Sequence, residues 1–475
     1  MGFVMNVISK SDLDKVFGPE SSGDTPWQRA KSSRREFVRG QTMLAEASAE
    51  ATGHRLAAAE ALNNFGFSTL LIAVEKGQAP LLHDRNDPAQ TLLRHREALG
   101  YTPQHLARLA KVTVEDVVKA EIPGKISSIR ILERLARPLA IDERVLGFKN
   151  QVGVEELGVR LRQLAHAEGS AGLSPTTVAA LAESAWVIAR QKSLLSLIGA
   201  PNPEGLKRFP PDDDYGYPTY ERGYHLAAKA RQLLGLDAET PIKSMRSLIS
   251  DTLNIPLVQT KLGRGLAGAT IANGEARGIV VNIEGDNKSV WVRRMTLAHE
   301  LGHLLWDPAR RLDRLMVDRY RDLAVNSPYR RDPVEIRANA FAIAFLAPPS
   351  AVDRMVYQAE DIPSAVFEVV RRFGVSVTAA AAHVGNVSRV RVVLPRGSLF
   401  PEPSDELRAL EDFTIDFFPI KDIPPALVGR FAWVVARALD EKVISKDTAA
   451  TLLQTTQDKI SPYFIKTVLN LIDAR

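Results

Sequence analysis

The chain reads Met295-Thr296-Leu297-Ala298-His299-Glu300-Leu301-Gly302-His303-Leu304-Leu305 at its most informative point. The apolar residues of this stretch predict a buried helix, on which residues four apart share one face. We therefore expect the imidazoles of His299 and His303 to point at the same spot, an arrangement that suits a tetrahedral zinc ion. Glu300 is turned about 100° further round the helix, where a base can take a proton from water beside the metal. The alternative interpretation is a pair of core histidines that bond backbone carbonyls.

A catalytic zinc ion needs a third protein ligand and keeps a fourth position open. The best candidate is Glu335, which opens a second apolar helix predicted for Glu335–Leu346, because a carboxylate in such surroundings needs a partner and a metal ion supplies one. Asn339 follows one turn later and is expected to hydrogen-bond a ligand side chain from outside the metal. From spacing alone, an exposed glutamate favoured by the helix dipole is an equal alternative for Glu335.

Three segments of the sequence resemble the ImmA/IrrE family of zinc metallopeptidases, and they are Ala276–Asn282, Arg294–His303 and Glu335–Ala342. The resemblance covers residues 220–395. It implies a gluzincin-like endopeptidase, and some members cleave a repressor to switch on stress or mobile-element genes. Carried over to this chain, the family pattern implies that His299, His303 and Glu335 ligate zinc and that Glu300 is the catalytic base.

Composition and length limit the class of protein. A chain of 475 residues predicts several domains with an ample core. The absence of cysteine excludes disulfides and a cysteine-ligated metal, and it agrees with a reducing cytoplasm. We see no signal peptide in Met1–Lys10, and the longest apolar run, Ala340–Ala347, is too short to span a bilayer. We therefore expect a cytoplasmic protein with no membrane partner. The net charge of +5 permits contact with nucleic acid without requiring it.

We predict an α+β fold that is mostly helical. The zincin-like metallopeptidase domain has a small sheet and lies between a helical helix-turn-helix domain and a C-terminal helical region. The predicted boundaries are residues 1–90 for a partly helical N-terminal extension, 91–150 for the helix-turn-helix-like domain, 151–217 for a helical connector and a linker rich in proline and aspartate, 218–395 for the ImmA/IrrE-like domain, and 396–475 for the C-terminal region.

Several local patterns give further predictions. Ala45–Leu62 is rich in alanine and predicts a helix, whereas Phe413–Phe418 is typical of a strand. A basic run from Arg29 to Arg39 predicts a solvated helix face, with phosphate contact as the alternative. Asp307–Asp332 predicts a solvated insertion, with a place beside the active site as the alternative. Ile255–Val258 and Gly278–Ile283 are typical of strands, and Gly263–Thr270 between them predicts a strand broken by glycine or a loop. This layout would place an edge strand above the metal helix, to which a peptide substrate could add as one more strand.

Residues 91–148 resemble the helix-turn-helix of Cro/repressor-like regulators. Thr102-Pro103 predicts the start of one helix, and Thr113 precedes a second. That second helix carries Lys119 as its only cation, so Thr113 and Lys119 are the predicted DNA contacts. Acidic side chains near its start repel phosphate. A DNA-binding domain and a partner-docking module of the same shape are therefore both left open.

Three hypotheses for the function follow. The first is a zinc-dependent endopeptidase that acts on a protein substrate, which the family resemblance implies is a transcriptional repressor or antitoxin. The second is a DNA-binding regulator whose metallopeptidase-like domain is a sensor that cuts little or nothing. The third, a structural zinc protein, is disfavoured because an open position beside a carboxylate base is reactive. The sequence does not decide which donor stabilises the oxyanion, and the candidates are Tyr320, Tyr329, His383 and an arginine. Whether the protein forms a homodimer is also left open.

Overall fold

The computed structural model describes residues 8–81, 87–143, 173–200, 209–212, 214, 216, 218–237, 239–273, 276–312, 316–320, 332–395 and 400–473. Contacts divide the chain into two units. Unit 1 comprises residues 1–173, 189–201 and 418–474, and unit 2 comprises residues 174–188 and 202–417 with the final residue. Much of the predicted connector, residues 151–172 and 201–208, lies outside the described residues. The prediction of an α+β, mostly helical chain with small sheets is confirmed.

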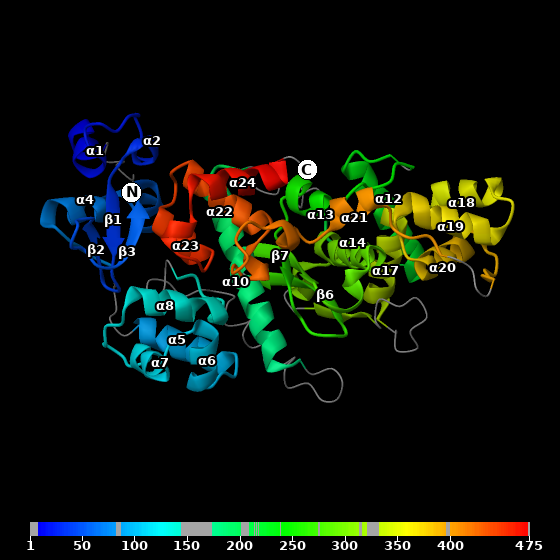
Figure 1. Ribbon diagram of the computed structural model, residues 1–475, viewed down its shortest axis with the longest axis horizontal. Coiled ribbons are helices and arrows are strands. Elements are labelled where there is room, and N and C mark those ends of the chain that lie inside the picture. The colour runs from blue at the N-terminus through cyan, green and yellow to red at the C-terminus, as the bar shows by residue number, and fades with distance from the viewer. Residues whose placement is uncertain are drawn as a thin grey trace. The chain divides into compact units, whose positions relative to one another are not determined.

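A four-stranded antiparallel sheet organises the first part of unit 1 (Figure 1). In the order β3-β1-β2-β4, its strands are β3 (His54–Ala57), β1 (Glu36–Arg39), β2 (Met43–Glu46) and β4 (Ala79–Pro80). The helices of this part are α1 (Lys10–Phe17), α2 (Pro26–Ser32), α3 (Ala58–Phe65) and α4 (Phe67–Lys76). Phe37 of β1 is opposite Leu56 of β3, and both side chains are buried in the core of the unit.

Two predictions for this region are wrong. The helix predicted for Ala45–Leu62 is instead β2, β3 and the start of α3, because pairing with β1 buries apolar side chains and outweighs the helix propensity of alanine. The basic run is not a solvated helix face, since Arg29 and Arg39 are both buried. Arg29 donates to Asp14 and Arg39 donates to the carbonyl of Glu143, so each buried guanidinium has a hydrogen-bond acceptor.

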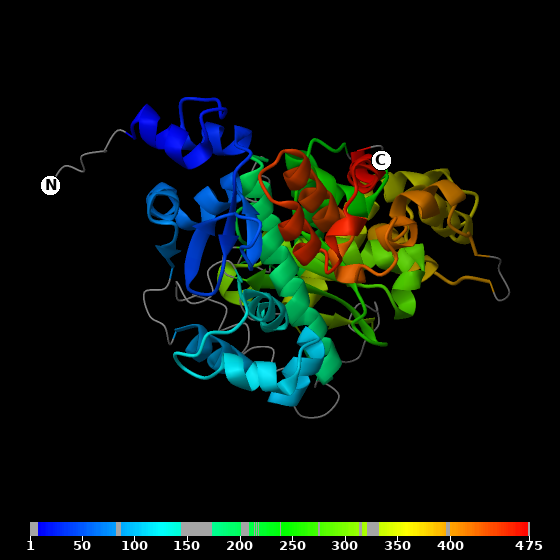
Figure 2. The same ribbon diagram turned by 60° about the vertical axis from the view of Figure 1, so that its left-hand side comes forward.

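Four helices follow in unit 1, and Figures 1 and 2 show them as one cluster. They are α5 (Asp87–Ala98), α6 (Pro103–Ala110), α7 (Val114–Ala120) and α8 (Ile129–Ala136), with the 3-10 turn η1 (Arg137–Leu139) after them. Lys111 ends α6 with a φ of 55°. The hydroxyl of Thr113 accepts a hydrogen bond from the backbone N–H of Asp116, so this side chain caps α7.

The C-terminal helices also belong to unit 1. They are α22 (Arg430–Asp440), α23 (Lys446–Leu452) and α24 (Pro462–Asp473), with the short turns η6 (Pro425–Leu427) and η7 (Gln457–Lys459). A buried polar cluster joins α23 to β3 and α8. In it, Nε2 of His54 lies 2.8 Å from Oγ1 of Thr448, and Arg130 pairs with Asp447. These contacts explain how segments some 390 residues apart in sequence form one core.

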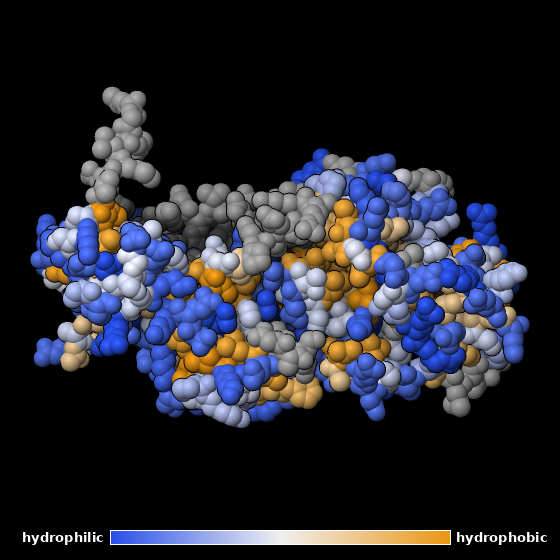
Figure 3. All heavy atoms as spheres, turned by 90° about the horizontal axis from the view of Figure 1, so that it is seen from above, coloured by the Kyte–Doolittle hydropathy of each residue, from blue (hydrophilic) through white to orange (hydrophobic). Residues whose placement is uncertain are grey.

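Among the described residues, no helix combines the length and apolar character needed to cross a bilayer. On the face seen in Figure 3, hydrophilic residues predominate and apolar residues form separate patches.

A second four-stranded sheet lies in unit 2. Its order is β5-β7-β6-β8, and its strands are β5 (Leu257–Thr260), β7 (Ala276–Asn282), β6 (Leu266–Asn273) and β8 (Met316–Arg319). β5 runs parallel to β7, whereas β6 is antiparallel to both β7 and β8. The glycine-rich stretch, for which either a broken strand or a loop was predicted, enters β6. A further strand, β8, covers the edge of β6 that we expected to be free.

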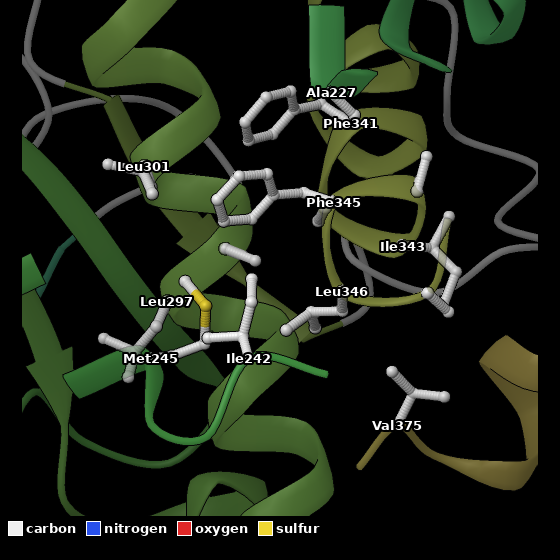
Figure 4. Packing of buried hydrophobic residues seen from close by; sticks show 14 of the residues in the cluster. Ala227, Ile242, Met245, Leu297, Leu301, Phe341, Ile343, Phe345, Leu346 and Val375 are labelled. Carbon is white, nitrogen blue, oxygen red and sulfur yellow. The ribbon is translucent and has the colours of Figure 1, made fainter. Parts of the chain in front are cut away.

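Three helices form the core of unit 2 beside this sheet. α14 (Val290–Trp306) contacts β6 and β7, and α17 (Pro333–Leu346) contacts α14 and α12 (Thr219–Leu233). Figure 4 shows Leu297 and Leu301 of α14 opposite Phe341 and Phe345 of α17. A Cβ added to Gly302 would lie 2.7 Å from the ring of Phe341, so only glycine lets these two helices approach so closely.

The remaining elements of unit 2 surround that core. They are the first half of α10 (Pro175–Leu197), α13 (Met245–Ser247), the π-helical turn η3 (Leu248–Thr252), η4 (Gly285–Lys288), α15 (Ala309–Leu312), α18 (Pro349–Gln358), α19 (Ile362–Phe373), α20 (Val377–Ser388), α21 (Asp405–Glu411) and η5 (Thr414–Phe417). The strand predicted for Phe413–Phe418 is wrong, because this segment forms η5. A buried ion pair between Arg294 and Glu411 fixes α14 to α21.

Candidate metal centre

The two histidines and the glutamate between them lie on α14 and are completely buried. The helix is fixed near its start, where Oγ1 of Thr296 donates to Oδ1 of Asn287 at 2.9 Å. Because 15 of its 17 residues are buried, the side chains of α14 have little room to change rotamer. His299, Glu300 and His303 are therefore held in place by the packing of the core.

The structure brings His299, His303 and Glu335 together at one point. Nε2 of His299 lies 3.0 Å from Nε2 of His303. Oε2 of Glu335 lies 3.3 Å from the first of these nitrogens and 3.5 Å from the second. Ligands about 2.1 Å from a tetrahedral zinc ion are separated by about 3.4 Å. The triangle of two nitrogens and one oxygen has the size that such an ion requires.

The other nitrogen of each imidazole is bound to the protein. Nδ1 of His303 donates to Oδ2 of Asp307 at 2.9 Å, and Asp307 pairs in turn with Arg337. Nδ1 of His299 donates to Oδ1 of Asn339 at 2.9 Å, because the amide nitrogen of Asn339 donates to the carbonyl of Glu335. In the neutral form of each imidazole, this partner fixes the tautomer that leaves Nε2 without a proton. The two Nε2 lone pairs therefore face the same point.

The acceptors around this point lack hydrogen bonds in the described part of the chain, although Nη2 of Arg311 forms a longer ion pair of 3.8 Å with Oε1 of Glu335. Both carboxylate oxygens of Glu335 and Oδ2 of Asp318 are buried without a hydrogen-bond partner in the described part of the chain. The lone pairs of two neutral imidazole nitrogens and of carboxylate oxygens without hydrogen bonds would repel one another in a low-dielectric interior. Their donor set, nitrogen and oxygen at tetrahedral spacing, fits a divalent cation. His299, His303, Asp318 and Glu335 form a group whose ligand atoms all lie within 4.8 Å of one another.

The ionisation of the group also reflects this clustering of charge. Burial alone would lower the pKa of His303, but the carboxylates of Glu335 and Asp307 raise it well above its usual value. Burial alone would raise the pKa of Glu335, but the two imidazoles lower it. The carboxylate of Glu335 is therefore held in its charged form, which is the form that binds a metal ion.

Glu300 lies beside the group and faces β6. Its Oε2 accepts a hydrogen bond of 2.8 Å from Oγ1 of Thr270, and its Oε1 is buried without a partner among the described residues. Burial and the nearby negative charge of Asp318 raise the pKa of Glu300. A Cβ on Gly268 would lie 2.8 Å from Oε1, so this glycine makes room for the carboxylate. Glu300 thus has one oxygen fixed and one available for a proton.

Sequence reasoning missed two residues of the site. Asp318 is 4% exposed and lies on β8, inside the segment Asp307–Asp332. The prediction of a solvated insertion is wrong for this residue, which fits the alternative of a place beside the active site. Pairing of β8 with β6 carries Asp318 into the core, and a four-residue strand gives little local signal. Asp307 was also missed, although its position four residues after His303 is a usable signal, because such residues share a helix face.

The candidates for other roles lie as follows. The hydroxyl of Tyr320 donates to the carbonyl of Glu284 and accepts from the backbone N–H of Asn287. His383 is buried, bonds Tyr224 and donates to the carbonyl of Ala347. Both side chains are thus engaged in structural contacts, and Tyr329 lies outside the described residues. Thr113 caps α7 and Lys119 is exposed on it, and both belong to unit 1.

Comparison with known proteins agrees with this geometry. Residues 269–384, about a quarter of the chain, match the family model described as IrrE N-terminal-like domain, Peptidase_M78. The matched segment runs from β6 to α20 and contains His299, Glu300, His303, Asp318 and Glu335. The match supports the ImmA/IrrE family for this segment and defines a metallopeptidase-like domain. No curated protein matches the chain.

Proposed function

We propose that this protein is a zinc-dependent endopeptidase. The observation that carries the proposal is the triangle formed by Nε2 of His299, Nε2 of His303 and Oε2 of Glu335, with sides of 3.0, 3.3 and 3.5 Å. These three side chains would hold the metal. Asn339 and Asp307 orient the two imidazoles, and the peptidase-like family match gives the reaction class.

Glu300 is the proposed general base. When bound, the zinc ion supplies a Lewis acid that polarises a peptide carbonyl and lowers the pKa of water. Glu300 accepts the proton of the attacking water and returns it to the leaving amine. Burial and the charge of Asp318 raise its pKa, so this carboxylate accepts a proton more readily than an exposed glutamate does. The hydrogen bond from Thr270 keeps the carboxylate in position throughout.

The proposed substrate is a protein of the transcriptional repressor or antitoxin class, in stress-response or mobile-element regulation. This assignment rests on the ImmA/IrrE resemblance and not on the geometry of the site. The proposed setting is the cytoplasm.

A Glu300→Gln variant tests the enzymatic proposal. Glutamine preserves the shape of the side chain and cannot act as a base, so we expect unchanged zinc content and no cleavage. New N-termini produced in a protease-depleted cell extract are identified by mass spectrometry, with Glu284→Gln on the surface as the matched control. The same variant then serves as a trap that retains the uncut substrate. Identical cleavage by wild type and Glu300→Gln would show that Glu300 is not the base.

A second candidate function has one observation in its favour. Asp318 joins His299, His303 and Glu335 in one group of possible metal ligands. A fourth protein ligand would occupy the position that a catalytic zinc site keeps open, which suits a sensor that binds metal and cuts little. In that case the predicted DNA contact through residues 91–148 would carry the output. Its α7 exposes Lys119, Val118 and Glu115 together, a mixed surface that suits a protein partner as well as DNA. Cleavage that depends on Glu300 decides between the two functions, because a sensor that does not cut has no need of a base.

A further inference from the structure

The strand β8 pairs with the side of β6 that borders Glu300. Gly268 and Thr270 of β6 face the carboxylate of Glu300, so this strand forms one wall of the proposed reaction site. The register places Asp318 of β8 opposite Gly268 and Val317 opposite Ala269. Because side chains alternate along a strand, Asp318 faces the same side as Gly268, which is the side of the metal group.

A peptide that binds to a sheet by strand addition occupies the edge of that sheet. On the side of β6 away from β7, the chain's own β8 takes that place. Backbone pairing gives β8 the hydrogen bonds that a substrate strand would otherwise make. Tyr320 follows β8 directly and anchors it, since its backbone N–H donates to the carbonyl of Gly265 at 3.2 Å and its hydroxyl bonds Glu284 and Asn287.

The carboxylate of Asp318 lies beside the triangle formed by His299, His303 and Glu335. Oδ2 of Asp318 lies 3.6 Å from Nε2 of His299, close to the spacing of about 3.4 Å between ligands of one zinc ion. Its side chain is 5% exposed, and Oδ2 has no hydrogen-bond partner in the part of the chain that is described. Burial of a carboxylate oxygen without a hydrogen bond raises the free energy of the folded state unless the oxygen binds a cation.

We propose that Asp318 is a fourth metal ligand and that β8 holds the place of the substrate, so that the folded chain is a latent peptidase. The inference rests on the proposed function of the same site. A substrate strand can pair with the edge of β6 only when β8 has moved away from it. Because Asp318 moves with β8, the fourth coordination position of the metal then becomes free. The peptidase would therefore be activated when β8 is displaced from β6.

Cobalt substitution in the full chain tests the ligand. We expect Asp318→Ala to weaken Co²⁺ binding tenfold or more, to change its visible absorption spectrum, and to bind acetohydroxamate at least tenfold more tightly than wild type. Asp353→Asn, on the exposed surface of α18, is the matched control and should resemble wild type. His303→Ala separates the two proposals, since it should abolish Co²⁺ binding whatever Asp318 does.

The Co²⁺ and acetohydroxamate titrations distinguish failure of this proposal from failure of the proposed function. Equal Co²⁺ affinity and equal acetohydroxamate affinity in wild type and Asp318→Ala would overturn the proposal and leave the proposed function intact. Undiminished Co²⁺ binding by His303→Ala would instead overturn the proposed function, and this inference with it.

A disulfide lock tests the displacement of β8 without altering the ligands. Ala269 and Val317 are register partners on the face of the sheet opposite Glu300. The chain has no cysteine of its own, so in the double variant Ala269→Cys, Val317→Cys the only disulfide that can form within the chain joins the two introduced cysteines. We expect oxidation to slow zinc removal by 1,10-phenanthroline at least tenfold and to prevent acetohydroxamate binding, and a phosphine reductant should reverse both effects.

The control for the lock is a pair on the other side of β6. Ala272 and Arg277 are register partners between β6 and β7, and a disulfide there should leave both readouts unchanged. If the oxidised Ala269→Cys, Val317→Cys protein released zinc and bound acetohydroxamate as its reduced form does, β8 would not need to leave and the proposal would be wrong.

Discussion

Nδ1 of His303 lies 2.9 Å from Oδ2 of Asp307, one helical turn further along the chain. The same carboxylate pairs with Arg337 of α17 through its other oxygen. One buried aspartate thus orients an imidazole and ties α14 to α17. An imidazole that donates to a carboxylate through Nδ1 is more basic at Nε2 and is a better metal ligand.

Asp307→Asn should therefore weaken metal binding without removing a ligand. An amide keeps the shape of the side chain but cannot supply the negative charge that polarises His303. We expect zinc affinity to fall about 10- to 100-fold, measured by competition with a chromophoric chelator. Asp353→Asn, on the exposed surface of α18, is the control. Unchanged affinity in Asp307→Asn would mean that this hydrogen bond does not tune the metal.

Gly268→Ala should separate catalysis from metal binding. The added Cβ would lie 2.8 Å from Oε1 of Glu300 and 2.9 Å from the carbonyl of Val280, so Glu300 must move. We expect normal zinc content, lost or strongly reduced cleavage, and a loss of about 1–3 kcal/mol in the free energy of unfolding. Zinc content and cleavage are measured on the same preparation. Full activity in this variant would show that the position of Glu300 is not critical.

His383 should make the free energy of unfolding depend on pH. Burial lowers its pKa to about 4, whereas an unfolded chain has a histidine pKa of about 6.5. Between these values the unfolded state binds more protons, so the free energy of unfolding decreases as the pH falls from 6.5 to 4. The effect is at most about 3.5 kcal/mol, at 1.4 kcal/mol per pKa unit.

His383→Gln removes the titrating group and keeps a donor for the carbonyl of Ala347. We expect a lower denaturation midpoint than wild type at pH 7.5, because the hydrogen bond from Tyr224 is lost or weakened, and a smaller decrease between pH 7.5 and pH 5. Parallel decreases in wild type and variant would assign the acid sensitivity to other groups.

The predicted DNA contact through residues 91–148 is tested by Lys119→Ala. A lysine on a phosphate releases about one counterion, so its loss should weaken DNA binding uniformly across sequences and reduce the salt slope by about 0.9. Thr113 is less suitable for substitution, because its hydroxyl caps α7 and its loss would destabilise the helix. Binding of wild type that is independent of salt, or absent at low salt, would favour the partner-docking interpretation.

The site residues that could be predicted from the sequence are those whose relative positions follow from local helix geometry. His299, Glu300 and His303 lie on one helix, where spacing alone fixes which side chains share a face. Asn339 was placed near a ligand by the same reasoning, and it lies 2.9 Å from Nδ1 of His299. Glu335 needed the family resemblance, because no spacing rule relates a residue on α17 to residues on α14.

The parts that depend on strand pairing were not predictable. Asp318 enters the site because β8 pairs with β6 in one register, and a shift of a single residue would turn its side chain to the other face. The strands β1 to β4 are two to four residues long, which is too short for alternation to be recognised. In Ala45–Leu62, tertiary pairing overrode a local preference for helix.

The central claim is that one zinc ion is bound by His299, His303 and Glu335. Anomalous diffraction from crystals of the zinc-loaded chain, collected on both sides of the zinc absorption edge, tests it most directly. The account predicts a single strong peak about 2.0–2.2 Å from both Nε2 atoms and from an oxygen of Glu335. A peak ligated by other side chains, or none there under saturating zinc, would contradict it.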